Sequence, residues 1–338
     1  MKTTVVSPAN IAFIKYWGRS DHKLFLPRNN SISMTIDGCL TTTTAEILDD
    51  LDKDIVEVQY YGRKPVKIDS KSRKSKALFE QIARIRKDSK RKEKVKIESV
   101  NNFPSDAGIA ASASSFSALT AALLVVYGQH EKFENKREFS RQVRLCGSGS
   151  AVRSCYGGFV EFALNIKKND AYARQLSDEN HWDLLDIVVV VDPGKKKYSS
   201  SHGHELADTS PYFETRISEM NKRIRETKKA IKNKDLEKLG TLIEQDSTSM
   251  HAIMMTSKPP IYYWNGASMK IMQEIIRWRE EDNLLSYFTL DAGPNVHVIC
   301  EAKDKNKIVR RLKRIEEVQF TIVNKPSEGT RIINKHLF

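Results

Sequence analysis

Five segments of the sequence carry residue types that bind anions or move protons. Three of them combine small residues with hydroxyl groups: 101–115, 147–153 and 198–203. Two others place charge at the ends of expected strands, a lysine and an arginine in 15–19 and a carboxylate in 291–295. Small side chains let a phosphate approach the backbone, and arginine binds carboxylates and phosphates through paired hydrogen bonds. Together the five segments predict a site for a multiply anionic substrate beside a nucleotide.

The segment 101–115 lies between an expected strand at 95–100 and an expected buried helix at 116–127. It is a loop of small residues that opens a helix, where unpaired N–H groups and the positive dipole end attract anions. An ordinary strand-to-helix turn explains this segment equally well when it is taken alone. It matches neither the phosphate-loop pattern nor the dinucleotide pattern.

Asp291 and Lys15 are the candidate catalytic residues. An aspartate near a lysine stays ionised and can accept or orient a hydroxyl proton during phosphoryl transfer, while nearby cations offset charge on the transferred group. Taken singly, Asp291 is interpreted as a turn former and Lys15 as surface charge beside core aromatic residues. His202 and His204 are expected to be exposed turn residues rather than catalysts or ligands.

The elements that position these segments are strands followed by helices that cross more strands. A first strand from residue 3 is expected to turn at Ser7-Pro8-Ala9-Asn10 and to resume from 11 to 17. The other expected elements are strands at 31–36, 41–47, 55–61, 159–164, 187–191, 288–290, 296–300 and 320–323, a basic helix, and helices within 136–145, 210–248, 267–281 and 304–315. Residues 147–153 are expected to form a flexible loop. This order predicts an α+β fold with two lobes, 1–190 and 191–338.

Composition favours a soluble globular protein. The chain has 338 residues, of which 40% are hydrophobic and 29% charged, so it can bury a large core. We find no apolar run long enough to span a membrane and no signal peptide, and therefore expect a cytoplasmic protein without membrane contact. The four cysteines (Cys39, Cys146, Cys155 and Cys300) lack metal-binding spacing and are expected to be reduced thiols.

The net charge of +13 comes almost wholly from residues 63–96, which hold 15 lysines and arginines against four acidic residues. Aromatic residues, on which nucleic-acid bases stack, are sparse there. Leu78, Phe79, Ile82 and Ile85 form one apolar stripe of an expected helix. We therefore interpret the segment as a solvated helix face that adds to the field around an anionic substrate. A nucleic-acid-binding protein is the competing class.

Six motifs in order along the chain resemble the diphosphomevalonate decarboxylase group of the GHMP kinase superfamily. Each motif is weak alone, but the ordered set is highly specific and extends from residue 8 to 295. The motifs are Asn10 to Gly18 (NIAFIKYWG), Leu26 to Ser33 (LPRNNSIS), Asn102 to Ala113 (NFPSDAGIAASA), Gly147 to Glu161 (GSGSAVRSCYGGFVE), Met250-His251-Ala252 with Pro259-Pro260, and Asp291 to Asn295 (DAGPN).

This resemblance implies a GHMP kinase fold, with a ribosomal-protein-S5-like N-terminal lobe, a C-terminal α/β sandwich lobe and the active site in the cleft between them. It also implies an enzyme of the mevalonate pathway of isoprenoid biosynthesis that uses ATP and Mg²⁺ and forms a homodimer. Such enzymes phosphorylate the 3-hydroxyl of mevalonate 5-diphosphate. The 3-phosphate then leaves as CO₂ departs, which gives isopentenyl diphosphate.

The resemblance also implies a role for individual residues. Asp291 would orient or deprotonate the 3-hydroxyl, and Lys15 would neutralise charge beside it. The implied substrate-binding residues are Tyr16, Trp17, Gly18, Arg19, Arg73, Ser148, Gly149, Ser150, Ala151, Val152, Arg153, Ser200 and Ser201. The implied ATP-binding residues are Pro104, Ser105, Ala107, Gly108, Ala110, Ala111 and Ser112, with Ser112 also a candidate Mg²⁺ ligand.

The chain departs from the family pattern at three positions in two of these segments. Arg19 stands where the family usually has lysine, which keeps the charge and changes its reach. Ala111 replaces the first of two serines in the ATP loop, and Asp106 places an acid where a small apolar residue is usual. As an acid near a helix start, Asp106 is also interpreted simply as a cap.

Other activities of the superfamily stay open. His202-Gly203-His204 and Met254 to Ser257 also resemble a bacterial and archaeal branch that includes decarboxylases of mevalonate 5-monophosphate. The sequence therefore leaves the number of 5-phosphates undecided, with the diphosphate preferred. Mevalonate 3-kinases resemble this chain less, because they lack the residues that Asp291 and Lys15 supply here. Another small-molecule kinase of the superfamily is a further alternative.

Overall fold

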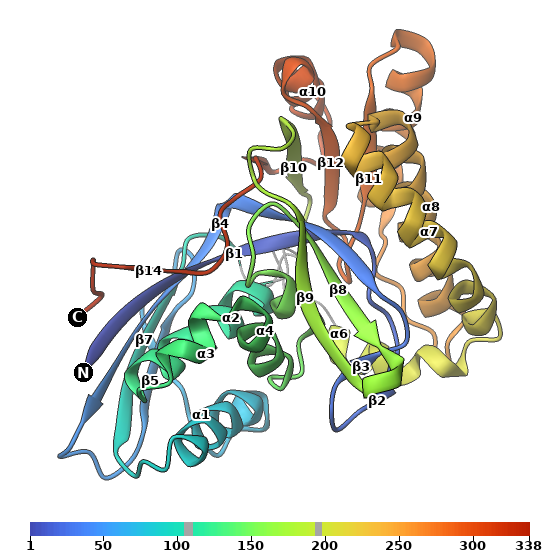
Figure 1. Ribbon diagram of the computed structural model, residues 1–338. Coiled ribbons are helices and arrows are strands. Elements are labelled where there is room, and N and C mark those ends of the chain that lie inside the picture. The colour runs from blue at the N-terminus through green and yellow to red at the C-terminus, as the bar shows by residue number, and fades with distance from the viewer. Residues whose placement is uncertain (105–110, 193–197) are drawn as a thin grey trace.

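The computed structural model describes residues 1–104, 111–192 and 198–338, and two β-sheets dominate it (Figure 1). The first sheet has the order β14 (Arg331–Ile333), β1 (Lys2–Ile14), β4 (Ser31–Leu48), β7 (Lys94–Asn101), β5 (Ile55–Gln59), β6 (Val66–Lys67), and β4 also pairs with β8 (Phe159–Asn165), which pairs with β9 (Asp170–Ser177). The second sheet has the order β11 (Ser286–Thr289), β12 (Val296–Glu301), β10 (Leu184–Val190), β13 (Phe320–Asn324). A short ribbon of β2 (Arg19–Asp21) and β3 (Leu26–Pro27) lies beside the end of β1.

Helices from the first half of the chain pack on the first sheet (Figure 1). They are α1 (Lys76–Asp88), α2 (Ala111–Val126), α3 (His130–Glu134), α4 (Lys136–Arg144) and α5 (Gly149–Arg153). Of these, α2 is apolar on nearly all sides and is buried against β1 and β4. The basic helix α1 buries Ile82 and Ile85 and leaves most of its charged residues toward solvent, as the sequence predicts.

The second sheet is covered on both faces, which explains why every residue of β10 is buried. Ile187 and Val189 face a core shared with α9 (Gly266–Asp282) and α10 (Lys305–Leu312). Val188 and Val190 face a second core shared with β1, α7 (Phe213–Asn233) and α8 (Leu236–Thr256). Because β1 belongs to the first sheet, this second core joins the two lobes, and it includes Phe13 and Ile14, which precede Lys15.

The two-lobed α+β arrangement predicted from the sequence is confirmed. The division into domains after residue 190 stays a prediction; β10 pairs within the second sheet, and the C-terminal β14 returns to the first. The four cysteines are free and buried, as expected. No helix within 1–104, 111–192 or 198–338 is long and apolar enough to cross a membrane.

The expected turn at Ser7 to Asn10 is wrong, because β1 runs without interruption from Lys2 to Ile14. Its register against β4 shifts between Pro8 and Ala9. A bulge is one of the places where a sheet accepts a proline, which has no N–H to donate. The two strands expected at 31–36 and 41–47 are likewise one long strand, β4, in which residues 37–39 lie between the partners of Ala9 and Pro8.

Two segments expected to be loops contain short helices. Gly149–Arg153 forms α5, and Ser200–Leu206 forms α6. In each case the preceding serine accepts a hydrogen bond from a backbone N–H of the first turn and so caps the helix. The prediction of a flexible loop at 147–153 is therefore wrong, and the serines of both segments are held by helix geometry.

Candidate active site

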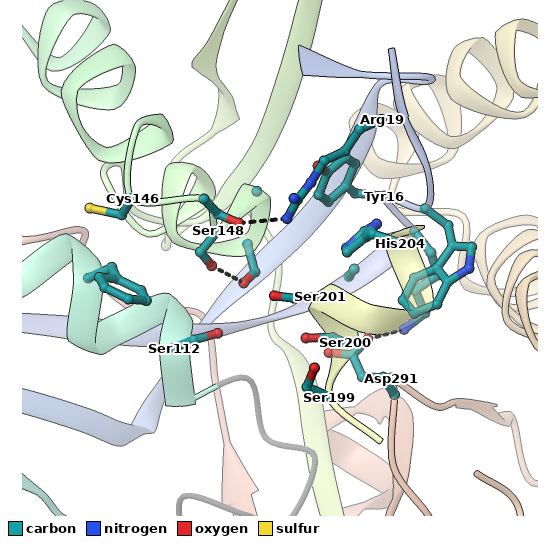
Figure 2. A pocket seen from close by; sticks show the side chains of 18 of the residues that line it. Tyr16, Arg19, Ser112, Cys146, Ser148, Ser199, Ser200, Ser201, His204 and Asp291 are labelled. Carbon is teal, nitrogen blue, oxygen red and sulfur yellow. Dashed lines mark hydrogen bonds and ion pairs between the residues drawn. The ribbon is translucent and has the colours of Figure 1, made fainter. Parts of the chain in front are cut away.

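A pocket of about 400 Å³ lies between the two lobes and gathers most of the candidate residues (Figure 2). Its walls come from the end of β1, the first turn of α2, the segment around α5, the start of α6 and the loop after β11. The lining side chains that the sequence predicts are Lys15, Tyr16, Trp17, Arg19, Ala111, Ser112, Ser148, Gly149, Ser150, Arg153, Ser200, Ser201 and Asp291. Segments far apart in the sequence thus meet at one cavity.

Lys15 and Asp291 form an ion pair at the base of this pocket, with 2.7 Å between Nζ and Oδ1. The lysine side chain is 2% exposed, whereas Asp291 keeps 22% of its side chain accessible. Burial raises the pKa of Asp291, but Lys15, His297 and Arg153 outweigh it, so this pKa lies below the ordinary value. Burial lowers the pKa of Lys15 more than the aspartate raises it. An ionised carboxylate therefore faces the cavity beside an enclosed lysine.

The backbone at Lys15 is clamped by buried side chains from α7 and α8. Asp246 accepts a hydrogen bond from the Lys15 N–H at 2.6 Å, and Arg216 pairs with Asp246 at 3.0 Å. From the other side, Asn29 donates to the Lys15 carbonyl at 3.0 Å. Helices of the second lobe thus fix the position of a candidate catalytic residue on a strand of the first.

Arg153 lies at the end of α5 and is 3% exposed. Its Nη1 donates to Ser31 Oγ at 2.7 Å, while its buried Nε has no partner within the described residues. Burial lowers the pKa of Arg153 to about 10, so the guanidinium stays charged at neutral pH. A buried arginine cation at the pocket wall is suited to hold a carboxylate or phosphate.

The hydroxyls of Ser148 and Ser150 lie 3.0 Å apart at the start of α5, and both face the pocket. Asn10 donates to the Ser150 carbonyl at 2.9 Å and so ties this segment to β1. Ala151 and Val152, although predicted to bind substrate, have fully buried side chains that belong to the core and do not line the pocket.

Tyr16 and Arg19 form the wall opposite Asp291 (Figure 2). Arg19 Nε donates to the Tyr16 hydroxyl at 3.1 Å, and its Nη2 donates to the Gly147 carbonyl at 3.0 Å. Between them, Gly18 does not line the pocket; its φ of +78° and its close approach to Phe213 explain why glycine is needed there. The guanidinium is therefore aimed by its neighbours before any ligand arrives.

Replacing Gly149 with alanine is expected to raise KM for the substrate by about tenfold or more, because misplacing a binding group by 1 Å costs up to ~100-fold. The new Cβ would lie 2.5 Å from the Tyr16 ring and push that wall outward. Steady-state kinetics measures the effect. Gly266→Ala is the matched control, since its Cβ meets no atom within 4 Å, and it should leave KM unchanged. An unaltered KM in Gly149→Ala would contradict a role for this wall.

The predicted ATP loop is described only in part. Ala111 and Ser112 open α2 and line the pocket, whereas Pro104 does not. The predictions for Ser105, Asp106, Ala107, Gly108 and Ala110 lie outside the described residues.

The chemistry of the donors bears on the candidate Mg²⁺ ligand. Within the described residues no cluster of three or more His, Cys, Asp or Glu side chains is suited to hold a metal ion. Mg²⁺ in phosphoryl-transfer sites, however, uses only one or two protein oxygens and completes its shell with water and substrate phosphates. The Ser112 hydroxyl, the candidate ligand, is a hard oxygen donor on this pocket and is of the type that such an ion accepts.

The pocket also has lining residues to which no individual binding or catalytic role was assigned from the sequence. Gly147, Ser199 and Ala292 belong to the candidate segments, and the others are Ala12, Lys74, Ala77, Phe116, Cys146, His204 and Met250. Lys74 lines it while the predicted Arg73 does not. The two are neighbours in one short 3₁₀ helix, so only their orientation separates them. The prediction that His204 is an exposed turn residue is wrong, since it lies in α6 and is 8% exposed.

A cleft of this kind, with a paired carboxylate and several anion-binding groups supplied by two lobes, defines a phosphoryl-transfer enzyme for small molecules. Comparison with known proteins gives the family. Residues 7–173 match the diphosphomevalonate decarboxylase-like N-terminal domain, and residues 186–333 match the mevalonate 5-diphosphate decarboxylase C-terminal domain. The chain belongs to the diphosphomevalonate decarboxylase family and has its GHMP kinase fold.

Relatives are similar over nearly the whole chain. The diphosphomevalonate decarboxylase of Candida albicans is 36% identical over 91% of this chain and 87% of its own length, and that of Homo sapiens is 36% identical over 86% and 75%. Mevalonate diphosphate decarboxylase from Staphylococcus aureus has a similar structure, with a TM-score of 0.88 and 33% identity over 98% of both chains. A structure described as MDDEF in complex with MVAPP, AMPPCP and magnesium gives a TM-score of 0.87, with 29% identity over 99% of both chains.

Proposed function

We propose that this protein catalyses the ATP-dependent decarboxylation of mevalonate 5-diphosphate to isopentenyl diphosphate. The observation that carries the proposal is the Lys15–Asp291 pair, whose carboxylate stays accessible in a pocket walled by Arg153, Arg19 and serine hydroxyls. Membership of the decarboxylase family supports it, as does the neighbouring structure that holds MVAPP with AMPPCP and magnesium.

Asp291 supplies the acceptor for the proton of the 3-hydroxyl. Because its pKa lies below the ordinary value, it is ionised at neutral pH and can accept a hydrogen bond from the substrate, which directs the hydroxyl oxygen at the phosphoryl donor. Lys15 keeps the carboxylate charged and in place, and its cation offsets negative charge that gathers between substrate and nucleotide. Positioning and electrostatics are the main contributions a protein makes to phosphoryl transfer.

Arg153 and the hydroxyls of Ser148 and Ser150 would hold the substrate carboxylate and the phosphate formed at the 3-position. Tyr16, Arg19, Ser200 and Ser201 would hold the 5-phosphate end. Four of the implied residues would act through backbone and packing: Gly18, Gly149, Ala151 and Val152. Trp17 would act through its ring, which packs against α6. Arg73, beside Lys74 in the basic segment, remains a proposed substrate contact. The substrate carboxylate must stay in a fixed orientation while the 3-phosphate and CO₂ leave, and the buried Arg153 can hold it there.

The nucleotide would bind along the segment from Pro104 to Ser112, with its triphosphate at the start of α2. Ser112, exposed at that helix start, would contact a phosphate or Mg²⁺. When bound, Mg²⁺ neutralises phosphate charge during transfer.

Arg153→Lys is expected to raise KM for the substrate roughly tenfold and to lower kcat, since lysine keeps the charge but loses the paired donors of guanidinium. Burial already lowers the pKa of Arg153, so an enclosed lysine would be partly neutral as well. Initial rates of ADP and CO₂ release measure both constants. Arg314→Lys, a change in a residue away from the pocket lining, is the control and should leave both constants unaltered.

The assay that decides the function supplies ATP and Mg²⁺ with either mevalonate 5-diphosphate or mevalonate 5-monophosphate. Release of ADP and CO₂ from the diphosphate is expected. A preference for the monophosphate would select the alternative branch, and ADP without CO₂ would select a kinase. No ADP and no CO₂ from either substrate would refute the proposal.

The family resemblance also supports a homodimer that works in the cytoplasm. Light scattering behind size-exclusion chromatography should give twice the chain mass of 38.6 kDa.

The competing class is a nucleic-acid-binding protein. If residues 63–96 bound RNA or DNA specifically, the association would be tight and would weaken steeply with salt. We expect only weak binding from this protein.

A further inference from the structure

His204 lies between two aromatic rings at the pocket, and no role in the site was assigned to it from the sequence. Its imidazole ring lies between Tyr16 and Trp17, with centroid distances of 4.3 and 4.5 Å (Figure 2). The side chain comes from α6, one turn beyond Ser200 and Ser201, and it lines the same wall. Gly203 permits the contact, since a Cβ there would lie 2.4 Å from the Trp17 ring.

The hydrogen bond that His204 makes fixes which ring nitrogen carries the proton. The backbone N–H of Gly18 lies 3.1 Å from His204 Nδ1. A backbone N–H can only donate, so Nδ1 must be the unprotonated acceptor of a neutral ring, and Nε2 must carry the hydrogen. Burial, followed by repulsion from Arg19 and smaller contributions from His22 and Arg153, lowers the pKa of His204 well below its ordinary value. The ring is thus a neutral donor with one N–H.

That N–H has no acceptor among residues 1–104, 111–192 and 198–338. Nε2 makes no hydrogen bond with the described part of the chain, and it is not among the buried polar atoms that are closed off without a partner. Its ring lines the cavity on the side where Arg19 and the α6 serines lie. The ring is held in one tautomer, and its N–H faces a cavity rich in cations. This N–H is therefore available to donate a hydrogen bond to an anionic ligand.

We propose that His204 Nε2–H donates a hydrogen bond to a phosphate oxygen at the 5-phosphate end of the substrate. This inference rests on the proposed function and extends it, because it names a substrate-binding residue outside the residues that the motifs assign. A neutral donor completes the oxygen shell without adding a third cation beside Arg19 and Arg153. The bond to Gly18 means that the donor is oriented before the substrate enters.

Two substitutions separate the two ends of the ring. His204→Asn places an acceptor near the position of Nδ1 but does not reach as far as Nε2, whereas His204→Gln reaches the position of Nε2 with a donor. Loss of a hydrogen bond to a charged group costs about ten- to a hundredfold in affinity. We therefore expect KM for mevalonate 5-diphosphate to rise by that factor in His204→Asn and to recover substantially in His204→Gln. His202→Asn, on the same helix and outside the lining, should leave KM unchanged.

A spectroscopic readout tests the proposal on the unaltered protein. In long-range ¹H–¹⁵N spectra the ring signals of His204, assigned by their loss in His204→Asn, should show the Nε2–H tautomer. Adding inorganic pyrophosphate or substrate should shift the Nε2–H resonance, as expected when the proton enters a hydrogen bond to an anion. Pyrophosphate alone reports binding without turnover.

The outcomes distinguish this inference from the proposed function. If the wild-type enzyme releases no CO₂ from either substrate, the proposed function fails, while the pyrophosphate shift still tests the donor. If the wild type turns over and His204→Asn keeps its KM, the inference is overturned. Equal impairment of His204→Asn and His204→Gln, with no Nε2–H shift on ligand addition, would reduce His204 to a packing residue and overturn it as well.

Discussion

Asp291→Asn is expected to lower kcat by roughly a thousandfold or more, because the amide cannot accept the hydroxyl proton and withdraws the charge that holds Lys15. The fold should survive the change. Asp291 keeps part of its surface open to the pocket, and Lys15, whose pKa burial already lowers, can lose its proton when the carboxylate is gone. Stopped assays of ADP and CO₂ measure the loss, and calorimetric titration with an ATP analogue should show nucleotide affinity within a few-fold of wild type.

Asp291→Glu isolates position from charge. It restores the negative charge but moves the carboxylate outward by one methylene, so kcat should remain low although Lys15 regains a partner. Asp50→Asn, in an exposed turn, is the control and should turn over normally. Near-normal turnover of Asp291→Asn would remove Asp291 from the mechanism, and loss of nucleotide affinity would mean that the substitution disturbs the cleft itself.

The sequence predicts where strands end more accurately than whether a strand is interrupted by a turn. Lys15 and Asp291 follow β1 and β11, where alternating apolar runs stop, and in the structure Lys15 Nζ lies 2.7 Å from Asp291 Oδ1. The expected turn at Pro8 fails for a physical reason: local residues indicate a break, but pairing with β4 carries the strand through a bulge. Long-range pairing decides such cases, and a single sequence does not display it.

The site shows the same limit at the level of side chains. The hydroxyls of Ser148 and Ser150 are candidate anion ligands, and the family resemblance adds their neighbours Ala151 and Val152. Only the formation of α5 shows that the side chains of Ala151 and Val152 turn into the core. His204 looks like an exposed polar residue next to glycine. Its burial depends on Trp17, nearly two hundred residues away in the sequence, which packs against Gly203. Family motifs therefore predict which segments lie at the site, but tertiary contacts decide which side chains of those segments line the pocket.

Asp246→Asn is expected to lower the free energy of unfolding by about 3–5 kcal/mol, since it leaves a buried cation without its counter-charge. Arg216 is 2% exposed and Asp246 is fully buried, so water cannot replace the lost carboxylate. Chemical denaturation followed by circular dichroism measures the change. Activity should fall further than folding alone explains, because the carboxylate that accepts the N–H of Lys15, the candidate catalytic lysine, at 2.6 Å becomes a neutral and weaker acceptor beside an unpaired guanidinium.

A double-mutant cycle tests whether the loss comes from the unpaired charge. Arg216→Met removes the cation, so the pair Asp246→Asn with Arg216→Met should be more stable than Asp246→Asn alone. Asparagine keeps an oxygen for the Lys15 N–H, so the double variant should also regain part of its kcat. If the double variant is less stable than both single variants, the unpaired charge of Arg216 does not cause the loss of stability in Asp246→Asn. In that case the packing of α7 on α8, rather than electrostatics, holds Lys15 at the junction of the two lobes.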